Sequence, residues 1–156
     1  MSEKTYNVLF ICTGNSARSI LAEALMSQAG RGRYKAYSAG SHPTGVVNPN
    51  ALQALWDMGV PATGARSKSW DEFATAEAPH LDFVFTVCDD AAGEVCPLWP
   101  GQPMTAHWGL PDPAAVQSSE EVVKLAFRDA AVTMKRRVDL MLALPLSWLD
   151  SMAMQR

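Results

Sequence analysis

The residues best suited to chemistry lie in one short segment, residues 12–19, which reads CTGNSARS. Cys12 offers a thiolate nucleophile, and Arg18 offers a planar guanidinium that can hold two oxygens of an anion. Gly14 permits backbone angles that a larger residue would forbid. A loop of this length can turn its amides inward on a tetrahedral oxyanion, with the cysteine beneath it, and Ser19 can then donate a hydrogen bond to the thiolate. The expected oxyanion-binding residues are Thr13, Gly14, Asn15, Ser16, Ala17 and Arg18.

The alternative interpretation of this segment is a buried structural cysteine beside a solvated arginine, because cysteine is common in protein cores. A bare Cys-x5-Arg match occurs often by chance. Here, however, the match lies between a predicted strand and a predicted helix, which favours the functional interpretation. The segment is not a Walker-type phosphate loop, because it contains no Gly-Lys-Ser/Thr.

Two further cysteines follow a second buried strand. Cys88 comes directly after the predicted strand 83–87, just as Cys12 comes directly after the predicted strand 6–11. If the two strands are neighbours in a parallel sheet, both thiols emerge at the same edge. Cys96 lies in the polar loop that follows Cys88, and that loop is flexible enough to bring the two sulfurs together.

Two other uses of these cysteines stay open at this point. In the first alternative, Cys88 and Cys96 are two unrelated free thiols. In the second, the cysteines contribute ligands to a zinc site. Zinc requires four ligands at closer spacing, and the remaining candidates, His42, His80 and His107, are scattered along the chain. We therefore predict no metal site.

Asp112 lies between two prolines, just after the predicted strand 104–108. The prolines stiffen the loop and hold one carboxyl group over the same edge of the sheet. A carboxylic acid in that place can protonate an oxygen that leaves the bound anion. The alternative is an ordinary turn, for which Pro-Asp-Pro is equally suitable.

The predicted elements alternate between strands and helices, which indicates an α/β fold with a mostly parallel, doubly wound sheet. In such folds ligands bind beyond the carboxyl ends of the strands. Ser69 and Glu72 form a capping-box pattern for the short helix. The expected strands are 6–11, 34–39, 83–87 and 104–108, and the expected helices are 17–29, 48–58, a short one from 69, and 119–143. The last helix is expected to have its apolar face at Val122, Leu125, Ala126, Val132, Val138 and Met141.

The length and composition exclude several classes of protein. The 156 residues predict a single domain, 1–156, with no internal repeat or linker. A net charge of −3 argues against a general nucleic-acid binder, and no apolar stretch is long enough to span a membrane. Three cysteines are too few for a disulfide scaffold, and the N-terminus has no signal-peptide pattern, so we expect a cytoplasmic protein with reduced thiols.

With these residues assembled, the chain resembles the arsenate reductases of the low-molecular-weight tyrosine-phosphatase fold, from about Asn7 to Met141. The resemblance rests on residues 12–19, on Tyr-Ser-Ala-Gly at 37–40, on Cys88 to Pro97, and on His-Trp-Gly at 107–109 leading to Asp112. The cysteine pair distinguishes the reductases from the phosphatases of this fold. The resemblance implies a three-layer α/β structure, with a four-stranded parallel sheet of order 2-1-3-4 flanked by helices.

The resemblance also implies a role for each site residue. Cys12 attacks arsenate, Arg18 and the loop amides bind the oxyanion, Asn15 holds the shape of the loop, and Asp112 is the general acid. Cys88 then attacks Cys12 of the arsenic adduct, and arsenite leaves with two electrons. Cys96 attacks Cys88, and the resulting disulfide is reduced by an external thiol, which is thioredoxin or glutaredoxin with glutathione. No cofactor is expected to be bound.

The chain departs from the family pattern at one point. Some thioredoxin-coupled members bind potassium beside the loop through Asn, Glu, Ser and a later Asp. Asn15, Glu23 and Ser38 match that pattern, but Ser69 stands where the Asp is expected. The nearby Lys68 offers a cation instead of the metal.

Two other functions compete with the reductase. A tyrosine phosphatase would need only Cys12, Arg18 and Asp112, although such enzymes usually carry an aromatic residue where Ala114 stands. An arsenic-binding sensor would use the three thiols as ligands, but an acidic chain without a basic DNA-reading helix gives it no output surface.

Overall fold

The computed structural model describes residues 5–62, 64–87 and 103–145. Cys88 and Cys96 therefore lie outside the described residues. The strands are β1 (Tyr6–Ile11), β2 (Tyr34–Ala39), β3 (Phe83–Thr86) and β4 (Met104–His107). The helices are α1 (Arg18–Ala29), α2 (Pro49–Asp57) and α4 (Glu120–Leu142), with 3-10 turns η1 (Trp70–Phe73) and η2 (Pro113–Ala115).

The four strands form one parallel sheet in the order β2-β1-β3-β4. The register aligns their carboxyl ends, because Ile11 pairs with both Ala39 and Thr86, and Thr86 pairs with His107. β1 is a central strand, so the loop that follows it emerges between the ends of β2 and β3. This edge of the sheet is where the sequence predicts the site.

The strands form where apolar, β-favouring residues are buried. Val8, Leu9, Phe10 and Ile11 of β1 are fully buried, as expected for a central parallel strand covered on both faces. Aromatic rings then connect the strand ends to the following loop, since Phe85 stacks on Trp108 with ring centroids 4.4 Å apart. This ring pair fixes the start of the segment that carries Asp112.

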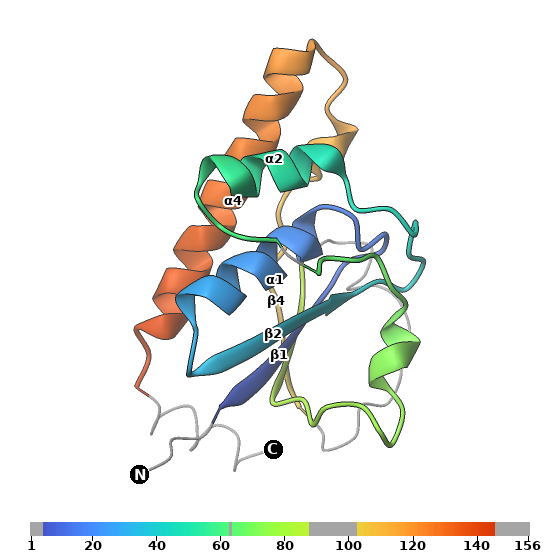
Figure 1. Ribbon diagram of the computed structural model, residues 1–156, viewed down its shortest axis with the longest axis vertical. Coiled ribbons are helices and arrows are strands. Elements are labelled where there is room, and N and C mark those ends of the chain that lie inside the picture. Colours follow the sequence, from blue (N-terminus) through green and yellow to red (C-terminus); the bar gives the residue numbers. More distant parts are fainter. Residues whose placement is uncertain (1–4, 63, 88–102, 146–156) are drawn as a thin grey trace.

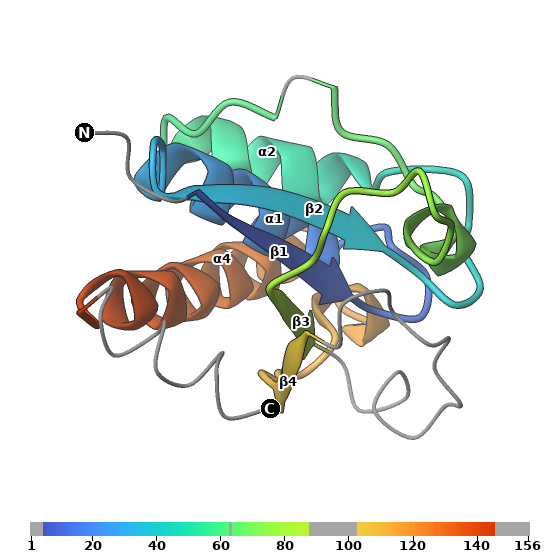
Figure 2. The ribbon, with the colours of Figure 1, turned by 90° about the horizontal axis from the view of Figure 1, so that it is seen from below.

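The helices begin and end where local sequence signals predict. Gly30 ends α1, Asn48 caps α2 by accepting from the Asn50 amide, and Ser119 caps α4 by accepting from the Val122 amide. α1 lies against β1 and β2, and both α2 and α4 pack against α1 (Figures 1 and 2). The predicted four-stranded parallel sheet of order 2-1-3-4, with its flanking helices, is confirmed.

Two local predictions are only partly confirmed. Of the predicted apolar face of α4, Val138 and Met141 are buried, whereas Val122, Leu125 and Val132 are exposed to solvent. The residues of α4 that are buried are Phe127, Ala130, Ala131, Met134, Val138 and Met141. The helix has two apolar faces, and spacing alone does not reveal which one meets the core.

The capping box at η1 is only half formed. Ser69 caps the turn by accepting a hydrogen bond from the Asp71 amide, as predicted. The Glu72 side chain instead accepts two hydrogen bonds from the Arg66 guanidinium, at 2.7 and 3.1 Å. A bidentate, charge-assisted pair is stronger than a single hydrogen bond to a backbone amide. The Glu72 carboxylate therefore binds Arg66 instead of capping the turn.

No helix in the described ranges is both long enough and apolar enough to cross a membrane.

Candidate functional site

The loop 12–17 joins the end of β1 to the start of α1 and is braced from outside through its carbonyl groups. The Thr13, Gly14 and Ser16 carbonyls accept hydrogen bonds from the backbone amides of His42, Thr44 and Asn48, at 2.9, 3.0 and 2.8 Å. All three donors belong to the segment between β2 and α2. The Ser67 hydroxyl also donates to the Gly14 carbonyl, at 3.1 Å. The carbonyl side of the loop is therefore tied to the rest of the protein.

The amides in the second part of the same loop, residues 14–17, are different. Within the described part of the chain, the backbone amides of Gly14, Asn15, Ser16 and Ala17 form no hydrogen bond. Asn15 has a φ of 45°, a left-handed conformation that asparagine tolerates better than most residues. A run of unbonded amides next to a helix N-terminus forms a concave set of donors, which is the arrangement that binds anions.

The Asn15 side chain holds this shape from the inside. It is fully buried, its Nδ2 donates to Ser19 Oγ at 2.8 Å, and its Oδ1 accepts from the Lys68 amide at 2.8 Å. Because Ser19 Oγ accepts from Asn15, its own proton is directed elsewhere. Cys12, which is 5% exposed, lies at the start of this loop.

Gly40 lies against the loop so closely that a side chain has no room. A Cβ atom at this position would lie 2.5 Å from the Thr13 carbonyl oxygen and 2.8 Å from that of Cys12. Gly40 also bridges to Ser69, and its amide donates to the Lys68 carbonyl at 2.9 Å. The glycine thus allows the end of β2 to support the loop on one side and the Lys68 segment on the other.

Arg18 and Asp112 meet over the carboxyl edge of the sheet. Arg18 Nη1 donates to the Leu110 carbonyl at 3.0 Å, and Arg18 Nη2 lies 3.6 Å from Asp112 Oδ2. Arg18 Nε is buried and forms no hydrogen bond with any described residue, so it is one more donor that the protein itself does not satisfy. The Asp112 carboxylate also accepts from the Ala114 amide at 2.9 Å, which caps η2.

The segment that carries Asp112 is tied to the sheet and to α4. The Trp108 amide donates to the Thr86 carbonyl at 2.6 Å, and the Leu110 amide donates to the Val87 carbonyl at 3.3 Å. Arg137 of α4 donates to the Trp108 carbonyl at 2.7 Å. These bonds hold the Asp112 loop beside the oxyanion loop, although about 100 residues separate the two in sequence.

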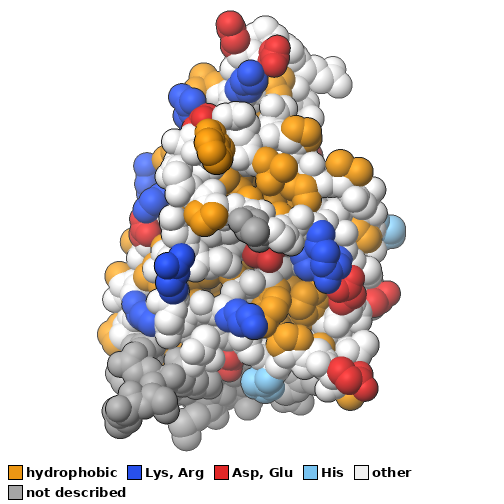
Figure 3. Space-filling view, viewed as in Figure 1, with side chains coloured by type: hydrophobic (Ala, Val, Ile, Leu, Met, Phe, Trp, Pro, Cys, Tyr) orange, Lys and Arg blue, Asp and Glu red, His pale blue; other side chains and the backbone are white. Residues whose placement is uncertain are grey.

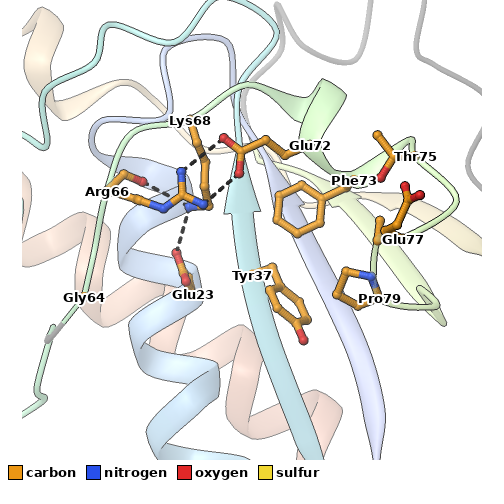
Figure 4. Close-up of a pocket in the computed structure, with 11 residues that line it drawn as sticks. Glu23, Tyr37, Gly64, Arg66, Lys68, Glu72, Phe73, Thr75, Glu77 and Pro79 are labelled. Atoms are coloured by element: carbon orange, nitrogen blue, oxygen red, sulfur yellow. Dashed lines mark hydrogen bonds and ion pairs between the residues drawn. The ribbon is translucent and has the colours of Figure 1, made fainter.

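A second charged cluster lies behind the loop, at the edge of a hollow of about 460 Å³ beside β2 (Figure 4). Lys68 Nζ donates to the Arg66 carbonyl at 3.0 Å and to Ser38 Oγ at 3.4 Å, and lies 3.9 Å from Glu23 Oε1. The Ser38 hydroxyl donates to Glu23. The Lys68 ammonium thus lies against both Glu23 and Ser38.

Burial dominates the electrostatics of that cluster. It raises the pKa of Glu23 above its usual value, and the Ser38 hydrogen bond and the Lys68 charge oppose the shift only in part. Burial also lowers the pKa of Lys68, against the favourable charge of Glu23. Both groups are partnered, so the cluster supports structure rather than offering a free donor or acceptor to a ligand.

The structure therefore brings together Cys12, Asn15, Arg18, Ser19 and Asp112 from the predicted site. The segment that contains Cys88 and Cys96 lies outside the described residues. The described chain reaches Val87, whose amide donates to the Ile11 carbonyl at 2.8 Å, one residue before Cys12.

Sequence reasoning missed two parts of the site. One is the role of Gly40, which the sequence marks only as the end of the motif 37–40, and whose close contact with the loop has a signal in its place directly after β2. The other is the Leu110 carbonyl, which orients Arg18. A backbone acceptor has no residue-type signal, so no sequence pattern indicates it.

Comparison with known proteins identifies relatives over most of the chain. The model of the low molecular weight phosphotyrosine protein phosphatase family matches residues 7–145. An arsenate reductase of Bacillus subtilis (strain 168) is 40% identical over 114 residues, which cover 73% of this chain and 78% of that protein.

Two solved structures are similar to the whole fold. One, described as an arsenate reductase in the phosphate binding state, has a TM-score of 0.72 and 29% identity, and the match covers 89% of this chain and 98% of that chain. The other, a Corynebacterium glutamicum thioredoxin-dependent arsenate reductase, has a TM-score of 0.59 and 25% identity, over 90% of this chain and 65% of that one. On the extent of the family match, this chain belongs to the low molecular weight phosphotyrosine protein phosphatase family.

Proposed function

We propose that this protein is an arsenate reductase, which converts arsenate to arsenite through Cys12, Cys88 and Cys96. The observation that carries the proposal is the loop after Cys12. The Thr13, Gly14 and Ser16 carbonyls accept hydrogen bonds from outside the loop, while the amides of residues 14–17 form none within the described chain. A tetrahedral oxyanion provides the acceptors that these amides and Arg18 Nε lack. The similarity to arsenate reductases, at up to 40% identity, supports arsenate as the anion.

The proposed first step is attack of the Cys12 thiolate on arsenic. Arg18 and the loop amides hold the arsenate oxygens, and the Asp112 carboxyl gives a proton to the oxygen that leaves as water. Asp112 is suited to this role because it lies next to Arg18 and is still 41% exposed. Ser19 is suited to stabilise the thiolate, because Asn15 occupies the acceptor side of its hydroxyl.

The proposed second and third steps move the electrons. Cys88 attacks the sulfur of Cys12, a Cys12–Cys88 disulfide forms, and arsenic leaves as arsenite with the electron pair of the broken sulfur–arsenic bond. Cys96 then attacks Cys88, which frees Cys12 and leaves a Cys88–Cys96 disulfide. Two thiols are oxidised for each two-electron reduction of As(V) to As(III), so the balance closes with one external dithiol per turnover.

We infer that thioredoxin is that dithiol, acting in the cytoplasm, where thiols are kept reduced. The thioredoxin-dependent relative from Corynebacterium glutamicum supports this choice. Arsenate-dependent NADPH oxidation should be measured with a thioredoxin system and, separately, with glutaredoxin and glutathione. We expect sustained turnover with thioredoxin, and turnover with glutaredoxin alone would reassign the partner.

The competing function is phosphotyrosine hydrolysis, which the family match and the Cys12, Arg18 and Asp112 geometry both favour. Hydrolysis moves no electrons, so it does not need Cys88 or Cys96. The double change Cys88→Ser with Cys96→Ser should therefore lose arsenate turnover and keep weak hydrolysis of an aryl phosphate. The retained hydrolysis is the internal control that the oxyanion site is still folded.

Cys96→Ser alone should release about one arsenite per enzyme and then stop, with Cys12 joined to Cys88. Mass spectrometry of the oxidised wild type should instead find Cys88 joined to Cys96. Sustained arsenate reduction by the double variant would refute the relay and leave a phosphatase-like site.

A further inference from the structure

Helix α4 has an apolar face that the fold leaves uncovered. Its buried side packs against α1, whereas four large apolar residues project on the opposite side. Their exposed fractions are 45% for Val122, 53% for Leu125, 43% for Val132 and 66% for Leu140. We call these four residues, with Asp129 and Arg136 between them, the outer stripe of α4.

The outer stripe has the spacing of a helix–helix seam. Positions 122, 125, 129, 132, 136 and 140 advance by three or four residues at each step, so they lie in one narrow row along the helix. At 1.5 Å per residue the row is about 27 Å long. A straight apolar row of this length is the surface that a second helix covers.

The charges within the stripe lack partners in the described part of the chain. Neither Asp129 nor Arg136 forms an ion pair or hydrogen bond there. Other charged residues of α4 are bound within the chain, namely Lys124 to Glu120, Arg128 to Asp57, Lys135 to Asp139 and Arg137 to the Trp108 carbonyl. The two unpartnered charges have opposite signs and lie about two helical turns apart.

We propose that the outer stripe of α4 is the interface of a symmetric homodimer, in which the α4 helices of two copies pack antiparallel. A two-fold axis beside Val132 places Asp129 opposite Arg136 of the partner subunit, and Arg136 opposite Asp129 of the partner subunit. The same axis places Leu125 opposite Leu140 of the partner subunit. A parallel pairing would instead set Asp129 against its own copy, so the charges select the antiparallel arrangement.

The shape of the stripe fits this pairing. A shallow hollow of about 340 Å³ lies at its C-terminal half, lined by Val132, Lys135, Arg136, Asp139 and Leu140. In the antiparallel dimer, Leu125 of the partner subunit enters this hollow. The two-fold axis repeats the contact, so each copy both gives and receives one leucine.

Neighbouring residues of α2 enlarge the apolar surface. Asp57 of α2 pairs with Arg128 of α4, and the adjacent Trp56 is 79% exposed. Figure 3 shows hydrophobic side chains reaching the surface where α2 crosses α4, among basic and acidic ones. Stable interfaces bury about 1,200–2,000 Å² in total, and one helix pair flanked by a tryptophan is at the lower end. We therefore expect a dissociation constant in the micromolar range.

The first test is the mass of the protein in solution, measured by sedimentation velocity from about 1 µM to about 1 mM. We expect a monomer–dimer equilibrium in the wild type. Leu125→Asp with Leu140→Asp should weaken association by more than about 100-fold, because it places four carboxylates in the apolar seam. Val46→Asp is the matched control, since Val46 is 65% exposed but lies outside α4, and it should not change the equilibrium. A wild type that stays monomeric throughout overturns the proposal.

The second test uses the reciprocal charges. Asp129→Arg alone and Arg136→Asp alone should each weaken self-association by about tenfold or more, because each sets like charges against one another twice. An equimolar mixture of these two variants should form heterodimers as tightly as the wild type, since both contacts become attractive again. Lys124→Glu, on the flank of the helix, should have no such effect.

A mixture that associates no better than either variant alone overturns the antiparallel pairing, as does wild-type association that none of these changes affects. The variants in α4 should keep wild-type arsenate turnover per site, because the loop 12–17 precedes α1 and does not touch the stripe. The association measurements therefore test the dimer, and the turnover measurements test the proposed function, independently of each other.

Discussion

The two polar clusters on either side of β2's carboxyl end are built from similar residues and differ in what they leave unsatisfied. Around loop 12–17, amide and guanidinium donors remain without acceptors in the described chain. Around Lys68, the ammonium has three oxygen neighbours and the Glu23 carboxylate has two donors. The difference teaches that a cluster of charged residues does not by itself mark a ligand site. A group of hydrogen-bond donors that the protein leaves without acceptors does mark one.

The two clusters are also joined through the backbone. The Lys68 amide donates to Asn15, and its carbonyl accepts from Gly40, so the satisfied cluster is the foundation of the unsatisfied one. If this division is correct, changes in the loop should affect turnover, and changes around Lys68 should affect mainly stability.

The largest effect is expected at Asp112. Asp112→Asn should lower kcat by about 100- to 10,000-fold, the range for loss of a general acid, while the affinity for arsenate stays near wild type. The amide can still accept from the Ala114 amide, so the η2 cap should persist. Steady-state kinetics with thioredoxin in excess measures both quantities. A near-normal rate would show that the Pro-Asp-Pro segment is an ordinary turn and that Asp112 is not the general acid.

Arg18→Lys comes next. Lysine keeps the positive charge but cannot bridge two oxygens, and it loses the Leu110 contact that orients the guanidinium. We expect kcat/KM for arsenate to fall by about 10- to 100-fold, mostly through KM. Competition by phosphate should weaken in parallel, which isothermal titration with phosphate can measure directly. Unchanged phosphate binding would show that Arg18 does not hold the anion.

Gly40→Ala tests the junction of the two clusters. Its methyl group would push on the Thr13 and Cys12 carbonyls, which are backbone atoms that cannot rotate away. We expect a loss of about 1–3 kcal/mol in the free energy of unfolding, together with a roughly tenfold fall in kcat/KM. Urea denaturation and kinetics check the two effects. Gly32→Ala is a control for stability alone, since Gly32 has an open surrounding but a φ of 87°.

The smallest effect on turnover is expected at Lys68. Lys68→Met should change kcat/KM by less than about fivefold but lower stability by about 1–3 kcal/mol near pH 8, since it leaves Glu23 partly buried without a cation. The double variant with Glu23→Gln should recover most of that loss. Thermal and urea denaturation across pH measure it.

The pH dependence of that loss has a definite sign. The pKa of Glu23 is already raised by burial, so the folded state holds the proton more tightly than the unfolded state does. Such a group contributes stability below the unfolded pKa that is lost as pH rises through the folded pKa. Removing Lys68 raises the folded pKa further, so the variant should lose stability over a wider pH range than wild type. Equal destabilisation near pH 5 and near pH 8 would contradict this account.

The sequence predicted the sheet because its strands depend on local signals, and it also pointed to the loop and the aspartate that meet at the sheet edge. The apolar run 6–11 and the caps Asn48 and Ser119 set their elements within one or two residues of the observed bounds. The loop 12–19 was found from its residue types together with its place between a predicted strand and a predicted helix. The failures have a common physical cause, since the face of α4 and the partner of Glu72 are each decided by competition between two satisfactory arrangements. Only the tertiary structure chooses between such arrangements.

The parallel register that aligns the four strand ends also determines when the site comes into existence during folding. Loop 12–17 is held by residues 42–48 and 67–68, and Arg18 is held by residues 110–112, so local chain segments cannot build the site alone. Parallel strands pair only after long loops have closed, which makes such folds slow to form. Any oxyanion that binds this site therefore binds the native state only, and phosphate or arsenate should raise the melting temperature of the whole structure with the logarithm of its concentration.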